Sequence, residues 1–94
     1  MKPGSLIQVN TDIKFNLYIN GQRSENETIF VPRKTIGLII EDIVENINIY
    51  RYSSTQAKET FTIMLFNNKL CYVQSEQLSS WIEHNFIVPL FTKE

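Results

Sequence analysis

The stretch from residue 61 to residue 78 constrains the fold more than any other part of this sequence. Residues 61–66 and 70–73 are two mainly apolar runs, and Asn67-Asn68 lies between them. This arrangement predicts a β-hairpin, because asparagine adopts the positive φ angles that a two-residue turn requires. Residues 75–78 then predict one short helical turn. Strand, turn, strand and helical turn follow one another in this order where a small five-stranded β-barrel closes.

The composition predicts a single small domain without strong charge. The chain has 94 residues, of which 43% are hydrophobic and 12% aromatic, enough for one modest core. Nine basic residues against ten acidic ones leave a net charge of −1. The densest basic cluster is the pair Arg33-Lys34, so bulk electrostatic capture of nucleic acid is not expected.

The single cysteine and the short apolar runs bear on the cellular compartment. Cys71 has no partner for an intrachain disulfide, which fits a reducing cytoplasm or a particle assembled there. Leu6-Ile7 is too short an apolar run for a secretory signal, and residues 36–40 and 61–66 are too short to span a bilayer. We therefore expect no association with a membrane.

Alternating apolar residues predict β-structure in the first half of the chain. Strands are expected at residues 6–9 and 35–42, with a long loop over residues 10–31 between them. Within this loop, the alternation over residues 13–19 predicts either a half-buried strand or an extended arm. Asn20-Gly21 predicts a turn after it, and the polar residues that follow predict the tip of the loop.

The second expected strand leads into a second long loop. Gly37 inside that strand predicts a bulge or a close approach to the backbone. Residues 43–60 predict the second loop, which contains the polar run at residues 53–58. Beyond the helical turn, residues 79–83 are compatible with either a closing strand or a continuation of the helix.

Residues 86–94 are predicted as a C-terminal tail that follows a barrel of residues 1–85. The tail is unusually apolar, and Pro89 within it is expected to prevent a smooth extension of sheet pairing. Such a segment reduces solubility if it stays exposed. It therefore either folds back over the barrel or docks on a neighbouring subunit, and the sequence leaves both alternatives open.

The order of these elements resembles the SH3-like barrel. Residues 4–9 and 35–40 match its first two strands, and the hairpin and helical turn at residues 61–78 match its last part. Within this fold, the chain is most similar to small accessory proteins of large contractile-tailed phages. An abundance of residues with AT-rich codons fits a low-GC genome, such as many bacteria and phages have. The residues that carry the similarity are Pro3, Gly4, Leu6, Ile7, Gly37, Leu38, Ile39, Ile40, Glu41, Met64, Leu65, Phe66, Tyr72, Val73 and Leu78.

The resemblance implies an all-β fold, namely a five-stranded SH3-like barrel with two long loops, a short helical turn near the C-terminus and an apolar C-terminal tail. It also implies a non-catalytic module, since barrels of this kind bind peptides, nucleic acid or neighbouring subunits. A phage protein of this class is expected in the host cytoplasm or in the virion.

Aromatic residues are the main candidates for a binding site. Four of them fall in or beside the two long loops and the barrel closure, where the resemblance implies an aromatic-lined groove for an extended peptide. The alternative is that these rings only cover the rim of a small core. Phe15 and Phe61 are expected in the core itself. With two aromatic residues of the tail, the predicted partner-binding residues are Tyr18, Tyr50, Tyr52, Trp81, Phe86 and Phe91.

No constellation in the sequence predicts catalysis, a cofactor or a metal. Cys71 and His84 are the nucleophile and base candidates, but no strand-to-helix elbow surrounds the cysteine, which is expected to be buried and inert. Glu41, Asp42 and Glu45 lack the spacing of a calcium loop and predict a solvated acidic segment. The three glycines do not form a phosphate-binding loop. We therefore expect a protein that is not an enzyme.

The sequence thus predicts a protein–protein interaction module, which docks on a larger phage or host partner through its loop aromatics and its tail. The alternative is an RNA-associated barrel that stacks bases on Tyr18, Tyr50 or Tyr52 with help from neighbouring cations (Arg33, Lys34 and Arg51). The near-neutral charge disfavours this alternative. Whether copies of the chain associate with each other is left open.

Overall fold

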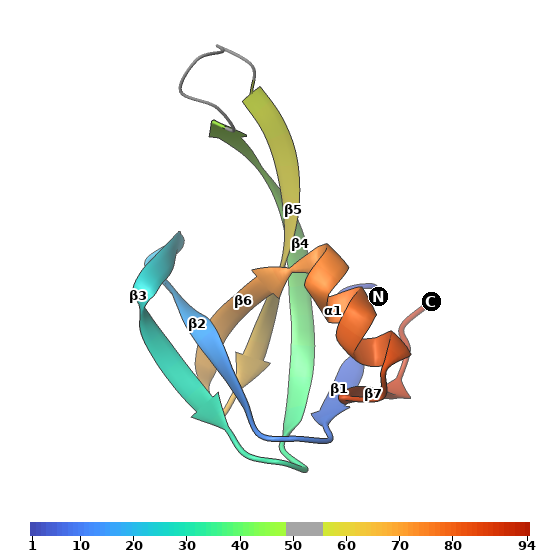
Figure 1. Cartoon of the computed structure of the whole chain (residues 1–94). Coiled ribbons are helices and arrows are strands. Elements are labelled where there is room, and N and C mark those ends of the chain that lie inside the picture. The colour runs from blue at the N-terminus through green and yellow to red at the C-terminus, as the bar shows by residue number, and fades with distance from the viewer. Residues whose placement is uncertain (49–55) are drawn as a thin grey trace.

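Antiparallel strands make up most of the computed structural model, which describes residues 1–48 and 56–94 (Figure 1). For residues 46–48 and 56–57 only the backbone is described. The described residues form seven strands and one helix, in the order β1 (Leu6–Val9), β2 (Ile13–Ile19), β3 (Gln22–Val31), β4 (Ile36–Asn48), β5 (Gln56–Phe66), β6 (Lys69–Gln74), α1 (Ser75–Glu83) and β7 (Ile87–Phe91). The expected all-β character, with one short helix near the C-terminus, is confirmed.

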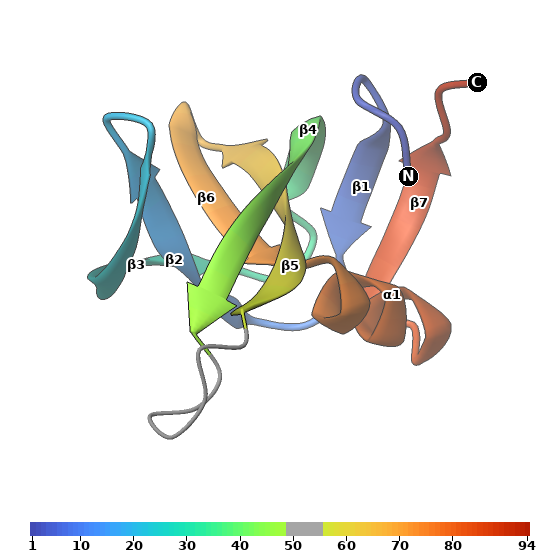
Figure 2. The ribbon, with the colours of Figure 1, turned by 90° about the horizontal axis from the view of Figure 1, so that it is seen from above.

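The seven strands form one sheet in the order β3-β2-β6-β5-β4-β1-β7, and every neighbouring pair is antiparallel. Seen from above, the strands follow a curve from β3 to β7, and the two edge strands stay apart (Figure 2). The predicted five-stranded barrel is therefore wrong, because the sheet has seven strands and does not close.

The first predicted loop is the main reason for this difference. Its two arms are the strands β2 and β3, which pair with each other over nearly their whole length. The polar residues predicted as the tip of the loop belong to β3, which begins directly after the Asn20-Gly21 turn. The hairpin then joins the sheet because Asn16 and Leu17 pair with Tyr72 and Cys71 of β6.

The second predicted loop is also largely sheet. β4 continues to Asn48, β5 starts at Gln56, and the two strands pair as far as these residues. Figure 1 shows the resulting hairpin projecting beyond the other strands. The pairing of two continuous strands overrides the weak strand propensity of the asparagines in β4. Tyr50 and Tyr52 lie outside the described residues.

The turns follow the prediction closely. Asn20 and Gly21 have φ angles of 53° and 74°, and Asn67 and Asn68 have φ angles of 51° and 64°. Both pairs therefore adopt the positive φ values of a two-residue hairpin turn. β5 and β6 flank the second pair, with Phe66 opposite Lys69. The hairpin predicted at residues 61–73 is confirmed.

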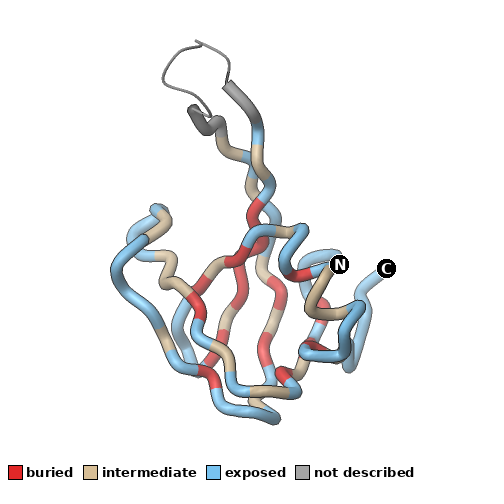
Figure 3. The backbone as a smooth tube through the Cα atoms, viewed as in Figure 1, coloured by how far each residue is buried: buried red, intermediate tan, exposed pale blue. Residues whose placement is uncertain are grey.

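The core lies on one face of the curved sheet and beneath α1. Figure 3 shows the buried segments in the central strands and near the helix, whereas most of β3 is exposed. Phe15 of β2 and Phe66 of β5 stack at its centre, with ring centroids 5.2 Å apart and ring planes at 12°. The cluster of buried residues consists of Ile7, Val9, Phe15, Val31, Ile39, Met64, Phe66, Cys71, Val73, Leu78 and Ile87.

Gly37 is closely approached, as predicted, and the approaching group is the Phe66 ring. A Cβ atom at this position would lie 2.3 Å from the nearest ring carbon, so only glycine fits. The bulge in β4 lies further along, between Ile39 and Glu41, where the register with β5 shifts.

The helix α1 is longer than the predicted helical turn, since it continues through residues 79–83 to Glu83. This settles the choice that the sequence left open in favour of a continued helix. Leu78 is its buried residue. The helix packs against β5, β6 and β7. Asn85, with a φ angle of 63°, reverses the chain after it.

The apolar segment after the helix pairs with the first strand of the same chain. β7 runs antiparallel to β1, Ile87 is fully buried, and the backbone N–H of Lys93 donates to Ser5 Oγ at 2.9 Å. Pro89 was expected to prevent such pairing, but it is tolerated on the edge strand. Asn10 N–H donates to the Phe86 carbonyl, so by the alternation of antiparallel pairs the nitrogen of Pro89 points away from β1.

Candidate partner-binding site

Two adjoining pockets meet at Trp81, in the second turn of α1. The inner pocket, of about 330 Å³, lies between the hairpin β2–β3, the strands β5 and β6, and the helix. The outer pocket, of about 400 Å³, lies between the start of β2 and Phe86. Lys14 and Trp81 line both. We call this surface the Trp81 groove and define it by Lys14, Arg23, Phe61, Tyr72, Trp81 and Phe86.

Trp81 is held in place by the core beneath it. Its ring meets the buried ring of Phe15 edge-on, with centroids 5.7 Å apart and planes at 77°. Such edge-to-face pairs contribute about 1 kcal/mol beyond the burial of the rings. The indole is only half-buried, so its remaining surface is available to the groove.

Arg23 fixes the wall of the inner pocket. Its guanidinium carbon lies 4.0 Å from the ring centre of Phe61 and 5.7 Å from that of Tyr72, which is cation–π geometry. Its Nε also pairs with the carboxylate of Glu45 on β4 at 2.5 Å. The Tyr72 hydroxyl donates to the Ser24 carbonyl at 3.0 Å. These contacts hold the hairpin β2–β3 against β5 and β6, so the pocket is formed without a ligand.

Phe86 forms the far side of the outer pocket. Its backbone N–H donates to the Trp81 carbonyl at 2.8 Å, which ties the two aromatic residues together. Its ring stacks on His84, with centroids 6.2 Å apart, and 47% of the residue is exposed. Nδ1 of His84 donates in turn to the Ser80 carbonyl at 2.8 Å. The groove therefore has a fixed backbone and an accessible aromatic ring at its outer end.

The predicted partner-binding residues do not lie together. Trp81 and Phe86 line the same pocket. Tyr18 lies at the other end of β2, in a separate pocket beside the Asn67-Asn68 turn. Phe91 lies on β7 opposite Leu6, with 52% of its surface exposed. The two remaining tyrosines, at positions 50 and 52, are outside the described residues.

Sequence reasoning missed four contributors to the groove. Phe61 is buried, as predicted for a core residue, yet it also forms part of the groove wall. Tyr72 could have been found, because it pairs with Ile63 and therefore lies on the same face as Phe61. Arg23 and Lys14 gave no signal, since their positions depend on the hairpin β2–β3 joining the sheet.

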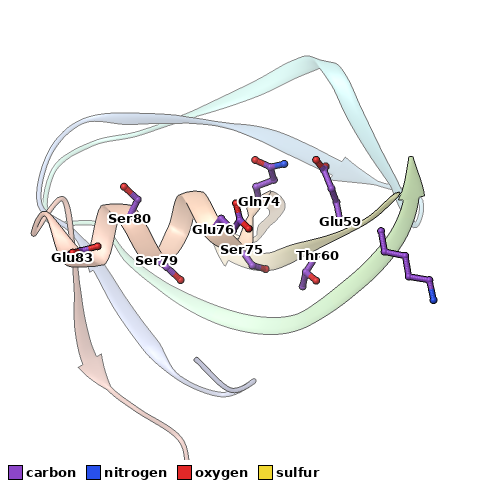
Figure 4. Close-up of a pocket in the computed structure, with 9 residues that line it drawn as sticks. Glu59, Thr60, Gln74, Ser75, Glu76, Ser79, Ser80 and Glu83 are labelled. Atoms are coloured by element: carbon purple, nitrogen blue, oxygen red, sulfur yellow. The ribbon is translucent and has the colours of Figure 1, made fainter. Parts of the chain in front are cut away.

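A polar pocket of about 580 Å³ lies on the opposite side of α1, between the helix and β5 (Figure 4). Thr62 Oγ1 donates to Asp42 Oδ1 at 2.8 Å, so the Ser75 hydroxyl, also 2.8 Å from Thr62 Oγ1, is the donor of that second bond. The described lining includes neither His nor Cys, and the Ser75 hydroxyl is already bonded. The lining consists of Lys58, Glu59, Thr60, Gln74, Ser75, Glu76, Ser79, Ser80 and Glu83.

Three of the residues considered for catalysis or metal binding are engaged in contacts within the fold. Cys71 is fully buried in the core, and desolvation raises the pKa of its thiol from 9.0 to about 12, so it is protonated at neutral pH. Asp42 and Glu45 are bonded to Thr62 and Arg23. In residues 1–48 and 56–94, no group of three His, Cys, Asp or Glu side chains is placed to hold a metal ion.

The comparisons with known proteins add no relative. No family model matches the chain, and no match is found among curated proteins or among solved structures. Within the described part of the chain, no helix is both long enough and apolar enough to cross a membrane. A function has to be inferred from the geometry of the groove itself.

Proposed function

We propose that this protein is a non-catalytic protein–protein interaction module that binds an extended segment of a partner protein in the Trp81 groove. One observation carries the proposal. Trp81 belongs to both adjoining pockets, and aromatic rings stand on either side of it, Phe61 and Tyr72 inside and Phe86 outside. Partly exposed aromatic rings in a concave site are the typical anchors of protein recognition.

The groove also indicates the chemistry of the bound segment. Two adjoining pockets suit an extended chain that seats one large apolar side chain in each. Lys14 lies between the pockets and makes no ion pair with any residue that the structure describes. A carboxylate between the two apolar anchors therefore complements the groove.

The wider biological setting is part of the same proposal. The resemblance to accessory proteins of contractile-tailed phages, together with the AT-rich codon bias, supports a small phage structural or accessory protein. It would act in the host cytoplasm or in the virion, on a phage or host protein. The two predicted binding residues that share a pocket, Trp81 and Phe86, support docking through aromatic side chains.

The test uses the only tryptophan of the chain as its reporter. Peptides of about twelve residues are selected from a random display library against the full chain, and binding is followed by the emission of Trp81. Phe86→Ala and Lys14→Glu are each expected to weaken the selected peptide at least tenfold, which corresponds to about 1.4 kcal/mol. Phe91→Ala is the matched control, since Phe91 has similar exposure but lies outside the groove.

Two results would contradict the proposal. The first is peptide binding that leaves the Trp81 emission unchanged and is indifferent to both groove variants. The second is that the chain selects no peptide but binds single-stranded RNA with an affinity that falls steeply with salt, by about three hundredfold between 50 and 200 mM for six phosphate contacts. That outcome would favour the alternative function, binding of RNA.

A further inference from the structure

A row of large apolar side chains crosses the face of the sheet that points away from the core. Directly opposed residues of antiparallel strands carry their side chains on the same face. The register places Phe91 opposite Leu6, Leu6 opposite Leu38, Leu38 opposite Leu65 and Leu65 opposite Leu70. We call these five residues the leucine row. Because it crosses five strands spaced about 4.8 Å apart, the row is roughly 20 Å long.

Three of the five residues of the leucine row are exposed in the single chain, and Leu38 and Leu65 between them are half-buried. Leu6, Leu70 and Phe91 expose 36%, 38% and 52% of their surface. Ile36, two residues before Leu38 on the same face of β4, exposes 53%. Their neighbours along the strands, such as Ile7 and Ile39, point to the other face and belong to the core. A row of apolar side chains that stays partly exposed in this way marks an interaction surface.

We propose that the leucine row is covered by the same row of a second copy of this chain, in a face-to-face dimer. The charges beside the row fit a second copy. Glu41 pairs with Ile63, which lies on the same face as Leu65, so its exposed carboxylate stands on one side of the row. Lys34 lies on the other side, where its carbonyl accepts a hydrogen bond from Gln8 Nε2 at 3.1 Å. Gln8 is on the same face as Leu6.

A two-fold axis along the row brings these charges together. It lays β4 of one copy across β4 of the other in the antiparallel sense, so each Glu41 faces the Lys34 of the other copy. The apolar residues at the centre meet their own equivalents. The net charge of −1 per chain adds little repulsion between copies. The charges beside the leucine row and its apolar side chains thus both favour a second copy of the chain as the partner.

The β7 edge of the sheet, one of its two edges, favours packing by the face over pairing by that edge. β7 is the edge strand next to the row, and the nitrogen of Pro89 points outward from it. Proline offers no N–H to a strand added there, so edge-to-edge pairing of two copies is interrupted at its centre. This dimer surface is distinct from the Trp81 groove and does not depend on the function proposed for the groove.

The test measures the mass of the full chain by sedimentation velocity over a range of concentrations. The wild-type chain is expected to form a dimer whose fraction rises with concentration. Ile36→Glu and Leu70→Glu are expected to raise the dissociation constant at least tenfold, with unchanged far-UV circular dichroism. Phe86→Glu is the control, because Phe86 is as exposed but lies in the groove, and it is expected to leave the dimer intact.

A charge exchange separates this dimer from any other mode of association. Glu41→Lys and Lys34→Glu are each expected to weaken the dimer severalfold, and the double variant is expected to restore it, because the pair is exchanged between copies. A chain that stays monomeric up to about 1 mM overturns the inference. A dimer that is indifferent to Ile36→Glu and Leu70→Glu, or that the charge exchange does not restore, also overturns it.

Discussion

Gly37 shows at the scale of a single residue how closely the strands of this sheet are fitted to the core. The Phe66 ring occupies the space of the missing side chain, with ring carbons 2.3, 2.6 and 2.7 Å from the position of a Cβ atom. Gly37→Ala is therefore expected to displace this fully buried ring and to lower the free energy of unfolding by about 1–3 kcal/mol. Denaturation by urea measures the difference.

The contact between the two residues can be isolated with a second substitution. Phe66→Leu makes room at the site, so Gly37→Ala is expected to cost less in that background than in the wild-type chain. Gly21→Ala is the comparison, because no atom lies within 4 Å of its Cβ position and its cost comes from the φ angle of 74° alone. Equal costs of Gly37→Ala with and without Phe66 would show that the ring is not the cause.

Cys71 gives the protein a defined sensitivity to alkaline pH. Burial raises the pKa of its thiol from 9.0 to about 12, so the unfolded chain loses this proton first as the pH rises. The contribution of Cys71 to the free energy of unfolding is therefore fully present below pH 9. It falls as the pH rises from 9 towards 12, by about 1.4 kcal/mol per pH unit. The difference in unfolding free energy between wild type and Cys71→Ala is expected to shrink above pH 9.

The wild-type chain and the Cys71→Ala variant share all their other ionisable groups. The difference between their free energies of unfolding therefore reports the titration of Cys71 alone. The measurement is a series of urea titrations of the two proteins between pH 7 and pH 10.5. A constant difference across this range would contradict the raised pKa of the buried thiol.

Single residues also show what the sequence could predict about burial and what it could not. Alternation placed Phe15, Cys71 and Val73 in the core correctly, because strand periodicity directly reports the buried face. The position of Arg23 over Phe61 could not be predicted. It depends on how a distant hairpin folds back over β5, and nothing in the local pattern of residues 22–27 reports that contact.

At the scale of elements, β7 supplies the second of the two strands that pair with β1, the first being β4. β7 pairs with β1 along its length, and Ile87 is fully buried among residues of the core. Deletion of residues 86–94 is therefore expected to abolish cooperative unfolding, because it exposes one side of β1 and opens the core. Circular dichroism during a urea titration measures this loss.

Two milder variants show which part of residues 86–94 the fold requires. Ile87→Ala keeps the strand and is expected to lower the free energy of unfolding by about 2–5 kcal/mol. Deletion of residues 92–94 removes the Lys93 hydrogen bond to Ser5 but leaves β7 intact, so the fold is expected to persist. A chain without residues 86–94 that still unfolds cooperatively at the wild-type midpoint would exclude this role of β7.

Elements with strong local signals were predicted well, and those that depend on distant pairing were not. The turn at Asn67-Asn68 is encoded by the residue type that positive φ requires. The joining of β2 to β6 rests on the pairing of Asn16 and Leu17 with Tyr72 and Cys71, which are more than fifty residues away in sequence. Propensity within residues 13–19 predicts an extended segment but cannot choose its neighbour.

At the scale of the whole molecule, two surfaces with different chemistry occupy different parts of one curved sheet. The Trp81 groove lies where α1 crosses the core side, and it combines aromatic rings with cations. The leucine row uses the face of β5 and β6 that also carries Phe61 and Tyr72, but it lies nearer the Asn67-Asn68 turn and is purely apolar at its centre. The sequence indicated that Trp81 and Phe86 were candidates, but only the register of the strands reveals that four leucines stand side by side.

The pairing of β1 with β7 has a consequence for how this protein is made. A ribosome releases β1 before the strand that covers its outer edge, because the residues of β7 lie 78 to 85 positions beyond their partners in β1 and follow all the other described strands. Until residues 87–91 have left the exit tunnel, Ile7 and Val9 lack the neighbour that completes their burial. The nascent chain therefore offers a chaperone an open strand edge until β7 has emerged.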